Sequence, residues 1–484
     1  MFKRVISLLL ALTMALAIVG CGEETAKEDD TSKDDTTATE QSKPQYVDKQ
    51  FELSGFWAPY EITEESFTLY KEAGFTHFAM INHSLNKTSE EQFYLGSERT
   101  MEALKMCKKV GLKAILNYND WIATWSEADE DYYGATPFSK FDVYGEYKDI
   151  ITGIHIVDEP YKNRDHFEIY GNKTLVEDFK KVYPNARYIA NLIPMTALSS
   201  RGFETYEEMM ALYEEVFMEP FDNPYVSVDV YPFHQNNTQD DGTLLANYLY
   251  IANSAKKYGV KPAYILQSSI GGADEGRKEF EMALSESDLR WEVYNALLFG
   301  ADTLQYYCYA VPMSLDENGD PVYMYDQCML NRDGTPSDVY FSLQKIHKEI
   351  QSYSNVILSY DWETTIGKSG YEETTYRVAP LELDDDFNYI TFNNAKNFVD
   401  VSCSHDLALS QFTSKDFGDA YMFLNWADRE DTNTLTATFK DCSKIMVYGG
   451  AGFSGTPKTL DLNEKGEVTL ELAYGEGVFI VPVA

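Results

Sequence analysis

The sequence is poor in the residues that build disulfide frameworks and metal centres. Its 484 residues include six Cys and seven His, and neither a CxxC nor an HExxH motif occurs. Apart from Cys21, the remaining five Cys are an odd number at long spacings, which argues against a disulfide framework and against a zinc ribbon. We therefore expect neither a required metal nor a cofactor.

Positive charge is also scarce. The chain has 40 Lys and Arg against 78 Asp and Glu, which gives a net charge of −38. A surface this negative repels phosphate backbones and anionic lipid headgroups, so nucleic acid is an excluded partner and membrane attachment must be covalent or hydrophobic. Neutral substrates are favoured. The 36 Tyr, 27 Phe and 6 Trp supply flat apolar faces with polar rims, on which sugar rings stack.

A short apolar run marks the N-terminus. Lys3 and Arg4 precede an apolar stretch over 5–19 that is too short for a membrane span with its flanks and has the layout of a signal peptide. The segment Ile18-Val19-Gly20-Cys21 resembles a bacterial lipobox. That resemblance implies that Cys21 is diacylated and becomes the mature N-terminus. We therefore predict an extracytoplasmic protein on the bacterial cell surface, attached to the membrane only through its lipid.

The composition divides the chain into four parts. The signal peptide and lipobox occupy residues 1–21. Residues 22–45 contain eight acidic residues, three Lys and five Thr but no aromatic residue, Val, Ile or Leu. Such a segment cannot bury enough apolar surface to fold, which predicts a disordered acidic tether over 22–48. The two folded parts are predicted at 49–354 and 355–484.

The segment 49–354 alternates short β-rich runs with amphipathic helical patterns. Strands are predicted at 52–57, 75–81, 112–117, 152–158, 187–192, 225–231, 262–267 and 303–309. Helices are predicted at 63–73, 97–110, 164–182, 204–217, 243–258, 286–299 and 337–353. Eight such units predict an α/β fold, a (β/α)8 TIM barrel. A doubly wound sheet is the alternative, but no GxGxxG or GxxxxGK[ST] motif follows any strand.

The segment 355–484 changes to alternating strands separated by Gly, Asp and Asn turns. Strands are predicted at 371–379, 387–392, 398–403, 420–426, 434–439, 444–448 and 477–482, with no long helical pattern. This arrangement predicts a smaller all-β sandwich that supports the barrel.

Reactive groups of a (β/α)8 barrel lie at the C-terminal ends of its strands, where the eight βα loops converge. Amides, Tyr, Trp and His gather at these positions, as a neutral ligand rich in hydroxyl groups requires. The predicted substrate-binding residues are Trp57, Tyr60, Asn82, His83, Asn117, Trp121, Asn191, Tyr231, His234, Gln267 and Tyr307. His155, within the fourth strand, is expected to pack inside the barrel with its hydrogen bond satisfied.

The fourth strand ends in Asp158-Glu159-Pro160, and adjacent carboxylates after a buried strand are costly unless they are used or paired. The stretch Ile154–Pro160 resembles the barrel glycoside hydrolases whose fourth strand ends in Asn-Glu-Pro or Asp-Glu-Pro. Segments around Val228–Pro232 and Arg290–Ala301 also resemble parts of such barrels. The resemblance implies that Glu159 is the general acid. The competing interpretation is that Glu159 has a structural role. It would then form a salt bridge with Arg187 or another basic group, or it would be a carboxylate stabilised by the dipole at the N-terminus of the helix that follows.

The sequence departs from this family at strand seven. Retaining members carry a nucleophilic Glu there, whereas this chain has Gln267, and an amide cannot form the glycosyl ester. Asp158 is one substitute, orienting a substrate 2-acetamido group as in substrate-assisted hexosaminidases, provided that a bend turns it inward. Asp229 is another, as the base of an inverting reaction. Asp274 or Glu275, in the loop after Gly272, is the third.

Two classes of function remain. The first is a cell-surface glycoside hydrolase that cleaves an oligosaccharide or polysaccharide, with Glu159, Asp158 and Asp229 as catalytic residues. The second is a lipoprotein that binds glycans on a TIM-barrel scaffold without catalysis. Gln267 favours the second class and Asp158-Glu159-Pro160 favours the first.

Overall fold

Short β-rich runs of this chain form strands that are covered by helices, as the alternating pattern predicts. The computed structural model describes residues 45–81, 93–118, 136–233, 241–271, 284–372 and 395–483. The predicted signal peptide, Cys21 and the tether as far as residue 44 lie outside these ranges.

Eight parallel strands are present in the described part of the first folded segment. They form two four-stranded sheets, in the orders β2-β3-β4-β5 and β1-β8-β7-β6. Leu192 and Val228 form a bridge that joins the two sheets on one side, and Thr76 N–H donates to Leu53 O at 3.0 Å on the other. The strands are β1 (Glu52–Gly55), β2 (His77–Ala79), β3 (Lys113–Asn117), β4 (Ile151–Asp158), β5 (Arg187–Asn191), β6 (Ser227–Asp229), β7 (Ala263–Gln267) and β8 (Thr303–Tyr307).

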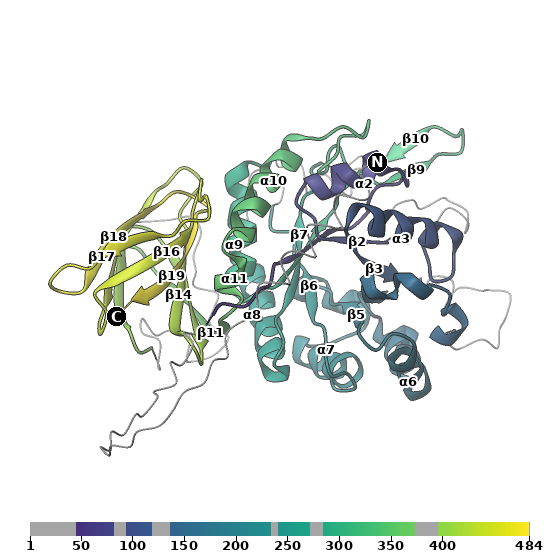
Figure 1. Cartoon of the computed structure of the whole chain (residues 1–484), viewed down its shortest axis with the longest axis horizontal. Coiled ribbons are helices and arrows are strands. Elements are labelled where there is room, and N and C mark those ends of the chain that lie inside the picture. Colours follow the sequence, from purple (N-terminus) through teal and green to yellow (C-terminus); the bar gives the residue numbers. More distant parts are fainter. Residues whose placement is uncertain are drawn as a thin grey trace, which may run out of the picture. The chain divides into compact units, whose positions relative to one another are not determined.

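This ring is a (β/α)8 barrel, which confirms the predicted fold class. Each strand lies within one residue of a predicted range, and Figure 1 shows the helices around the strands. The helices are α2 (Glu64–Glu72), α3 (Glu98–Val110), α5 (His166–Tyr170), α6 (Lys173–Val182), α7 (Tyr206–Tyr213), α8 (Asp241–Tyr258), α9 (Glu286–Leu298), α10 (Asp338–Gln351) and α11 (Ser354–Ile357).

Polar side chains set the starts of these helices. Ser97, Thr205, Ser285 and Ser337 each accept a hydrogen bond from the first turn of the helix that they precede. The helix predicted at 164–182 is in fact two, because α5 ends before Gly171 and Asn172 caps α6. Short 3₁₀ turns, η2 (Phe138–Phe141) and η3 (Gly145–Ile150), precede β4.

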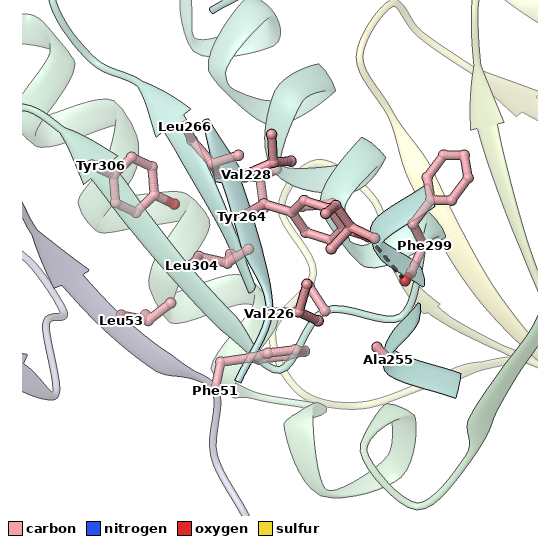
Figure 2. Packing of buried hydrophobic residues seen from close by; sticks show 14 of the residues in the cluster. Phe51, Leu53, Val226, Val228, Ala255, Tyr264, Leu266, Phe299, Leu304 and Tyr306 are labelled. Carbon is pink, nitrogen blue, oxygen red and sulfur yellow. Dashed lines mark hydrogen bonds between the residues drawn. The ribbon is translucent and has the colours of Figure 1, made fainter. Parts of the chain in front are cut away.

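Alternation along the strands divides the core into an inner and an outer layer. In β7, Ala263 and Ile265 belong to apolar clusters inside the barrel, whereas Tyr264 and Leu266 pack against the helices. Figure 2 shows Tyr264 directed toward Phe299, whose carbonyl accepts from the Tyr264 hydroxyl at 3.4 Å. The interior side chains fill the barrel, so a ligand has access only at its ends.

The C-terminal segment forms two antiparallel sheets. One has the order β11-β13-β14-β19-β16-β17 and the other the order β12-β15-β18, with apolar side chains of both sheets in one cluster. This is the predicted sandwich. The strands are β11 (Asp361–Lys368), β12 (Phe398–Cys403), β13 (Leu407–Ser414), β14 (Gly418–Asn425), β15 (Asn433–Phe439), β16 (Lys444–Gly449), β17 (Lys458–Asp461), β18 (Glu467–Leu472) and β19 (Gly477–Val483).

Four strands of the sandwich, β11, β13, β17 and β18, were not predicted. In β11 and β13 the reason is polar residues at buried positions: Thr365 and Ser410 are fully buried and bond to each other at 2.7 Å. Ser410 Oγ also donates to the carbonyl of Leu298 at the end of α9, at 2.6 Å. The predicted strands at 371–379 and 387–392 fall almost wholly outside the described residues.

Candidate active site

The chain bends where β4 ends, and this bend places two carboxyl groups side by side. The pairing of β4 with β5 shifts between His155 and Val157, which is a β-bulge. Glu159 follows with a φ of 46°, in the left-handed region, and its N–H donates to Asn191 O at 2.9 Å. A regular strand would send Asp158 and Glu159 to opposite faces. The bulge and the left-handed residue supply the bend that the prediction required.

Asn191, the last residue of β5, connects the carboxylate of β4 with that of β6. Its Nδ2 donates to Asp158 Oδ1 at 3.3 Å and to Asp229 Oδ1 at 2.8 Å. The Ser227 hydroxyl donates to Asn191 Oδ1 at 2.9 Å, which fixes the orientation of the amide. Both donors of the amide therefore point at carboxylates, and the three strands β4, β5 and β6 are joined at their C-terminal ends.

The pKa of each of the three carboxyl groups is raised. Burial raises the pKa of Asp229 far above its usual range, and the charges of Glu159 and Asp158 raise it further. Burial and the charge of Asp158 raise the pKa of Glu159 to about 7, against the opposing effect of Arg201. Burial also raises the pKa of Asp158. Neighbouring carboxylates do not all ionise together, so this cluster retains protons near neutral pH.

The three groups differ in their access to solvent. The side chain of Asp158 is 57% exposed and that of Glu159 is 22% exposed, while Asp229 is buried. Asp158 therefore meets solvent directly, although the surrounding protein desolvates its carboxyl group enough to raise the pKa. A ligand at this end of the barrel would reach Asp158 and Glu159 before Asp229.

Arg201 is a site residue that the sequence analysis missed. It ends η5 (Met195–Arg201), in the segment after β5, and its Nη2 donates to Glu159 Oε2. Its guanidinium lies 4.2 Å from the ring centroid of Tyr161. The competing interpretation of Glu159 named Arg187 or another base, and the structure supplies Arg201. Arg187 instead pairs with Glu52, at the opposite end of the barrel. The one available signal was the position of Arg201 in a βα loop.

Aromatic side chains line the barrel mouth beside the carboxylates. Tyr231 and Tyr307 stack with ring centroids 5.4 Å apart and planes 26° apart. Phe56 and Tyr325 approach the Tyr307 ring edge-on, at 6.3 and 5.9 Å, and Trp57 packs against the same cluster. We call these five residues the aromatic wall.

Part of this wall comes from an insertion that was not predicted. The two short strands β9 (Met313–Leu315) and β10 (Pro321–Tyr323) form a hairpin after β8. Tyr325 follows this hairpin, and Met324 Sδ accepts from the Tyr307 hydroxyl at 3.5 Å.

Asn117 is the last residue of β3, and Tyr60 lies in the segment that follows β1. Asn117 Nδ2 donates to Phe93 O at 3.2 Å, and the Tyr60 ring lies 4.6 Å from the Arg99 guanidinium. Both residues are partly exposed. Their predicted contact with a substrate stays a prediction.

His155 is buried inside the barrel as expected, whereas its Nε2 does not make the expected hydrogen bond. Its Nε2 is 4.0 Å from Asp158 Oδ1 and has no hydrogen-bond partner among the described residues. Burial lowers the pKa of His155 to about 4, so the ring is neutral at neutral pH.

The structure corrects the prediction for Gln267. This residue is fully buried, and its Oε1 accepts from Phe233 N–H at 3.0 Å. Its Nε2 donates to the carbonyls of Phe233 and Ser269, at 3.1 and 3.3 Å. Each polar atom of the amide is thus bonded to the backbone, and Gln267 holds the segment after β6 instead of contacting a ligand.

Several predicted site residues lie outside the described residues. These are Asn82, His83, Trp121 and His234, together with Asp274 and Glu275. Within the described part of the chain, no group of three His, Cys, Asp or Glu side chains is arranged to hold a metal ion.

Comparison with known proteins finds solved structures that are similar to this chain in fold. No protein-family model matches the chain, and no curated protein matches it in sequence. A family 39 glycoside hydrolase from the gut symbiont Bacteroides cellulosilyticus is 12% identical, with a TM-score of 0.46 over 91% of this chain and 83% of that one. A GH30 endoxylanase from Clostridium papyrosolvens is 10% identical, with a TM-score of 0.41 over 91% and 97%. Such likenesses concern the chain fold alone, so the reaction must be inferred from the side chains.

Proposed function

We propose that the protein is a glycoside hydrolase in which Glu159 protonates the leaving oxygen. The observation that supports this most strongly is a carboxyl group with a pKa of about 7 beside a second carboxyl group, at the end of the barrel where βα loops converge. A general acid works best when its pKa lies near the working pH. Paired carboxyl groups are the machinery of glycoside hydrolysis.

Asp158 is the better candidate for the second carboxylate. Its side chain is exposed, whereas Asp229 is buried and its Oδ1 accepts from Asn191. Burial and the neighbouring carboxylates raise the pKa of Asp229, which disfavours the ionised form that a general base needs. A carboxylate adjacent to the acid can orient a 2-acetamido group that attacks the anomeric carbon. We therefore propose a substrate-assisted reaction, with Asp229 and Asn191 as positioning residues.

The proposed substrate is a neutral oligosaccharide or polysaccharide. Trp57, Tyr231 and Tyr307 of the aromatic wall are partly exposed, and such aromatic side chains suit the C–H patches and hydroxyl groups of a sugar. Three carboxyl groups and a strongly negative chain disfavour acidic polymers.

A panel of aryl glycosides that includes N-acetylhexosaminides tests this proposal. We expect hydrolysis of at least one N-acetylhexosaminide, and for Glu159→Gln a loss of at least about a hundredfold in turnover on the glycoside with the least acidic leaving group. The matched control is Glu168→Gln, an exposed residue on α5, which should keep full turnover. Full activity of Glu159→Gln on that least activated glycoside would overturn the assignment. Hydrolysis restricted to sugars without an acetamido group would remove the role of Asp158.

The second candidate is a glycan-binding protein without catalysis. The ion pair of Arg201 with Glu159 favours it, because a cation stabilises the ionised carboxylate, which cannot donate a proton. Calorimetry separates the two candidates. A binding protein would take up an oligosaccharide unchanged, and Tyr307→Ala would weaken that binding while Glu159→Gln would not.

The proposed location is the bacterial cell surface, through a lipid on Cys21. In the described part of the chain, no helix has both the length and the apolar character needed to cross a membrane. A Cys21→Ala variant tests the anchor in the native host: the protein should leave the membrane fraction and should no longer incorporate a labelled fatty acid. Membrane retention of that variant would contradict the lipoprotein assignment.

A further inference from the structure

Two thiols meet beneath the aromatic wall. Cys308 follows Tyr307 at the end of β8, and Cys328 lies 20 residues later, beyond the β9–β10 hairpin. Their Sγ atoms are 3.4 Å apart, and both residues are fully buried. Their apolar neighbours include Phe56 and Ile265. The two sulfurs are therefore in contact, in a place from which water and external thiols are excluded.

Backbone hydrogen bonds hold the two segments that carry these residues next to each other. Met329 N–H donates to Cys308 O at 3.4 Å, and Leu330 N–H donates to Tyr309 O at 2.8 Å, so the two segments run side by side. Hydroxyl groups fix both carbonyls: Ser268 Oγ donates to Cys308 O at 3.0 Å and Ser337 Oγ donates to Cys328 O at 2.7 Å. The Sγ contact of 3.4 Å is therefore made between backbone segments that hydrogen bonds hold in place.

We propose that Cys308 and Cys328 form a disulfide that closes the β9–β10 insertion onto the end of β8. Each thiol loses its proton, one S–S bond forms, and the two electrons pass to a small-molecule or protein disulfide, which becomes two thiols. A rotation about the two side-chain bonds brings the sulfurs from contact to bonding distance. An exported protein meets such oxidants during folding, before the pair is buried.

The crosslink would stabilise the aromatic wall. Tyr307 directly precedes one Cys and Tyr325 lies three residues before the other, while the hairpin between them is exposed over 315–322. The hydrogen bonds of Asp316 in this segment are made to residues of the same hairpin, and the closed loop would limit the excursions of the hairpin as a whole. The disulfide therefore acts on the wall through the backbone, whatever ligand the wall binds.

Peptide mapping of the full-length protein tests the proposal. The purified chain is refolded from denaturant in the presence of oxidised glutathione, so that oxidation can precede burial. It is then denatured again, alkylated without reduction, and cleaved after Glu residues, which separates the two Cys at Glu317. We expect one peptide pair joined through Cys308 and Cys328, with Cys107, Cys403 and Cys442 alkylated as internal controls. Denaturation is essential, because burial would block alkylation in either redox state. Complete alkylation of both residues, or separate glutathione adducts on them, would overturn the proposal.

Thermal unfolding provides a second readout. Reduction should lower the Tm of the wild-type protein by about 3–5 °C, as expected for opening a loop of this length in a domain of this size. The same reductant should leave the Tm of Cys328→Ser unchanged, and should affect Cys442→Ser as it does the wild type. An equal response of Cys328→Ser and the wild type would contradict the crosslink even if the variant itself is less stable.

Discussion

Arg201 donates a hydrogen bond through Nη2 to Oε2 of Glu159, so the proposed proton donor is held beside a cation. Burial and the charge of Asp158 raise the pKa of Glu159, and Arg201 lowers it. The resulting pKa of about 7 is therefore a balance between burial and the charge of Asp158 on one side and the Arg201 guanidinium on the other. The two sides of this balance can be altered separately.

Removal of Arg201 should move the pH dependence of the reaction. Because the general acid must be protonated, kcat/KM should fall about tenfold per pH unit above pH 7. In Arg201→Met the pKa of Glu159 rises, so this fall should begin at a higher pH. Arg164→Met is a matched control, since Arg164 also lies 4.2 Å from the Tyr161 ring centroid. An NMR titration of the Glu159 carboxyl group measures the same change in pKa without an activity assay. An unchanged or lowered pKa in Arg201→Met would show that the ion pair does not govern Glu159.

Asn191 should contribute to stability as well as to the site. In Asn191→Ala, Asp158 and Asp229 both lose the amide that donates to them. A buried polar group left without its partner costs about 1–3 kcal/mol, so urea unfolding should show a loss of that size. The exposed Asn355→Ala should change stability by less than about 0.5 kcal/mol. Equal stability of the two variants would mean that the amide does not hold the carboxylates.

The ion pair at the other end of the barrel should make stability depend on pH. Burial raises the pKa of Glu52, but Arg187 and His77 together outweigh it, so the pKa lies below its usual value. The stabilisation is therefore present above the unfolded pKa of about 4.3 and is lost as the pH falls through the folded pKa.

Arg187→Met tests this ion pair. At pH 7 it should lower the free energy of unfolding by about 3 kcal/mol, because it leaves a largely buried carboxylate without its guanidinium partner and with only His77 beside it. The loss should shrink in acid, where Glu52 is protonated. Lys109→Met breaks the exposed pair with Glu64 and should cost less than about 1 kcal/mol. A loss that is constant between pH 7 and pH 3 would exclude Glu52 as its source.

The barrel was predictable because its strands carry continuous apolar runs and its helices begin at Ser, Thr or Asn caps. Both signals are local in the sequence. The strands β11 and β13 were not predictable in this way, because each carries a buried polar residue. Thr365 and Ser410 form a hydrogen bond with each other, and Ser410 also donates to the last residue of α9. Buried hydroxyl groups look like surface residues until the tertiary contacts are known.

The site was predictable only where it adjoins a strand. Asp158, Glu159, Asn191 and Asp229 all lie at strand ends, and the structure brings them together. Arg201 lies 42 residues from Glu159, and no spacing rule connects the two. The same strand-end rule selected Gln267, which bonds to backbone instead, because position alone does not show where a side chain finds its partners.

The dependence on the leaving group tests the role of Glu159 most directly. Turnover of wild type and Glu159→Gln is compared on one glycoside series whose phenol leaving groups span a wide range of pKa. A phenol of low pKa leaves without a proton, whereas one of high pKa needs the acid. We predict that Glu159→Gln hydrolyses the most activated substrate at nearly the wild-type rate and loses at least about a hundredfold on the least activated one. An equal loss across the series, or no loss at all, would contradict proton donation by Glu159.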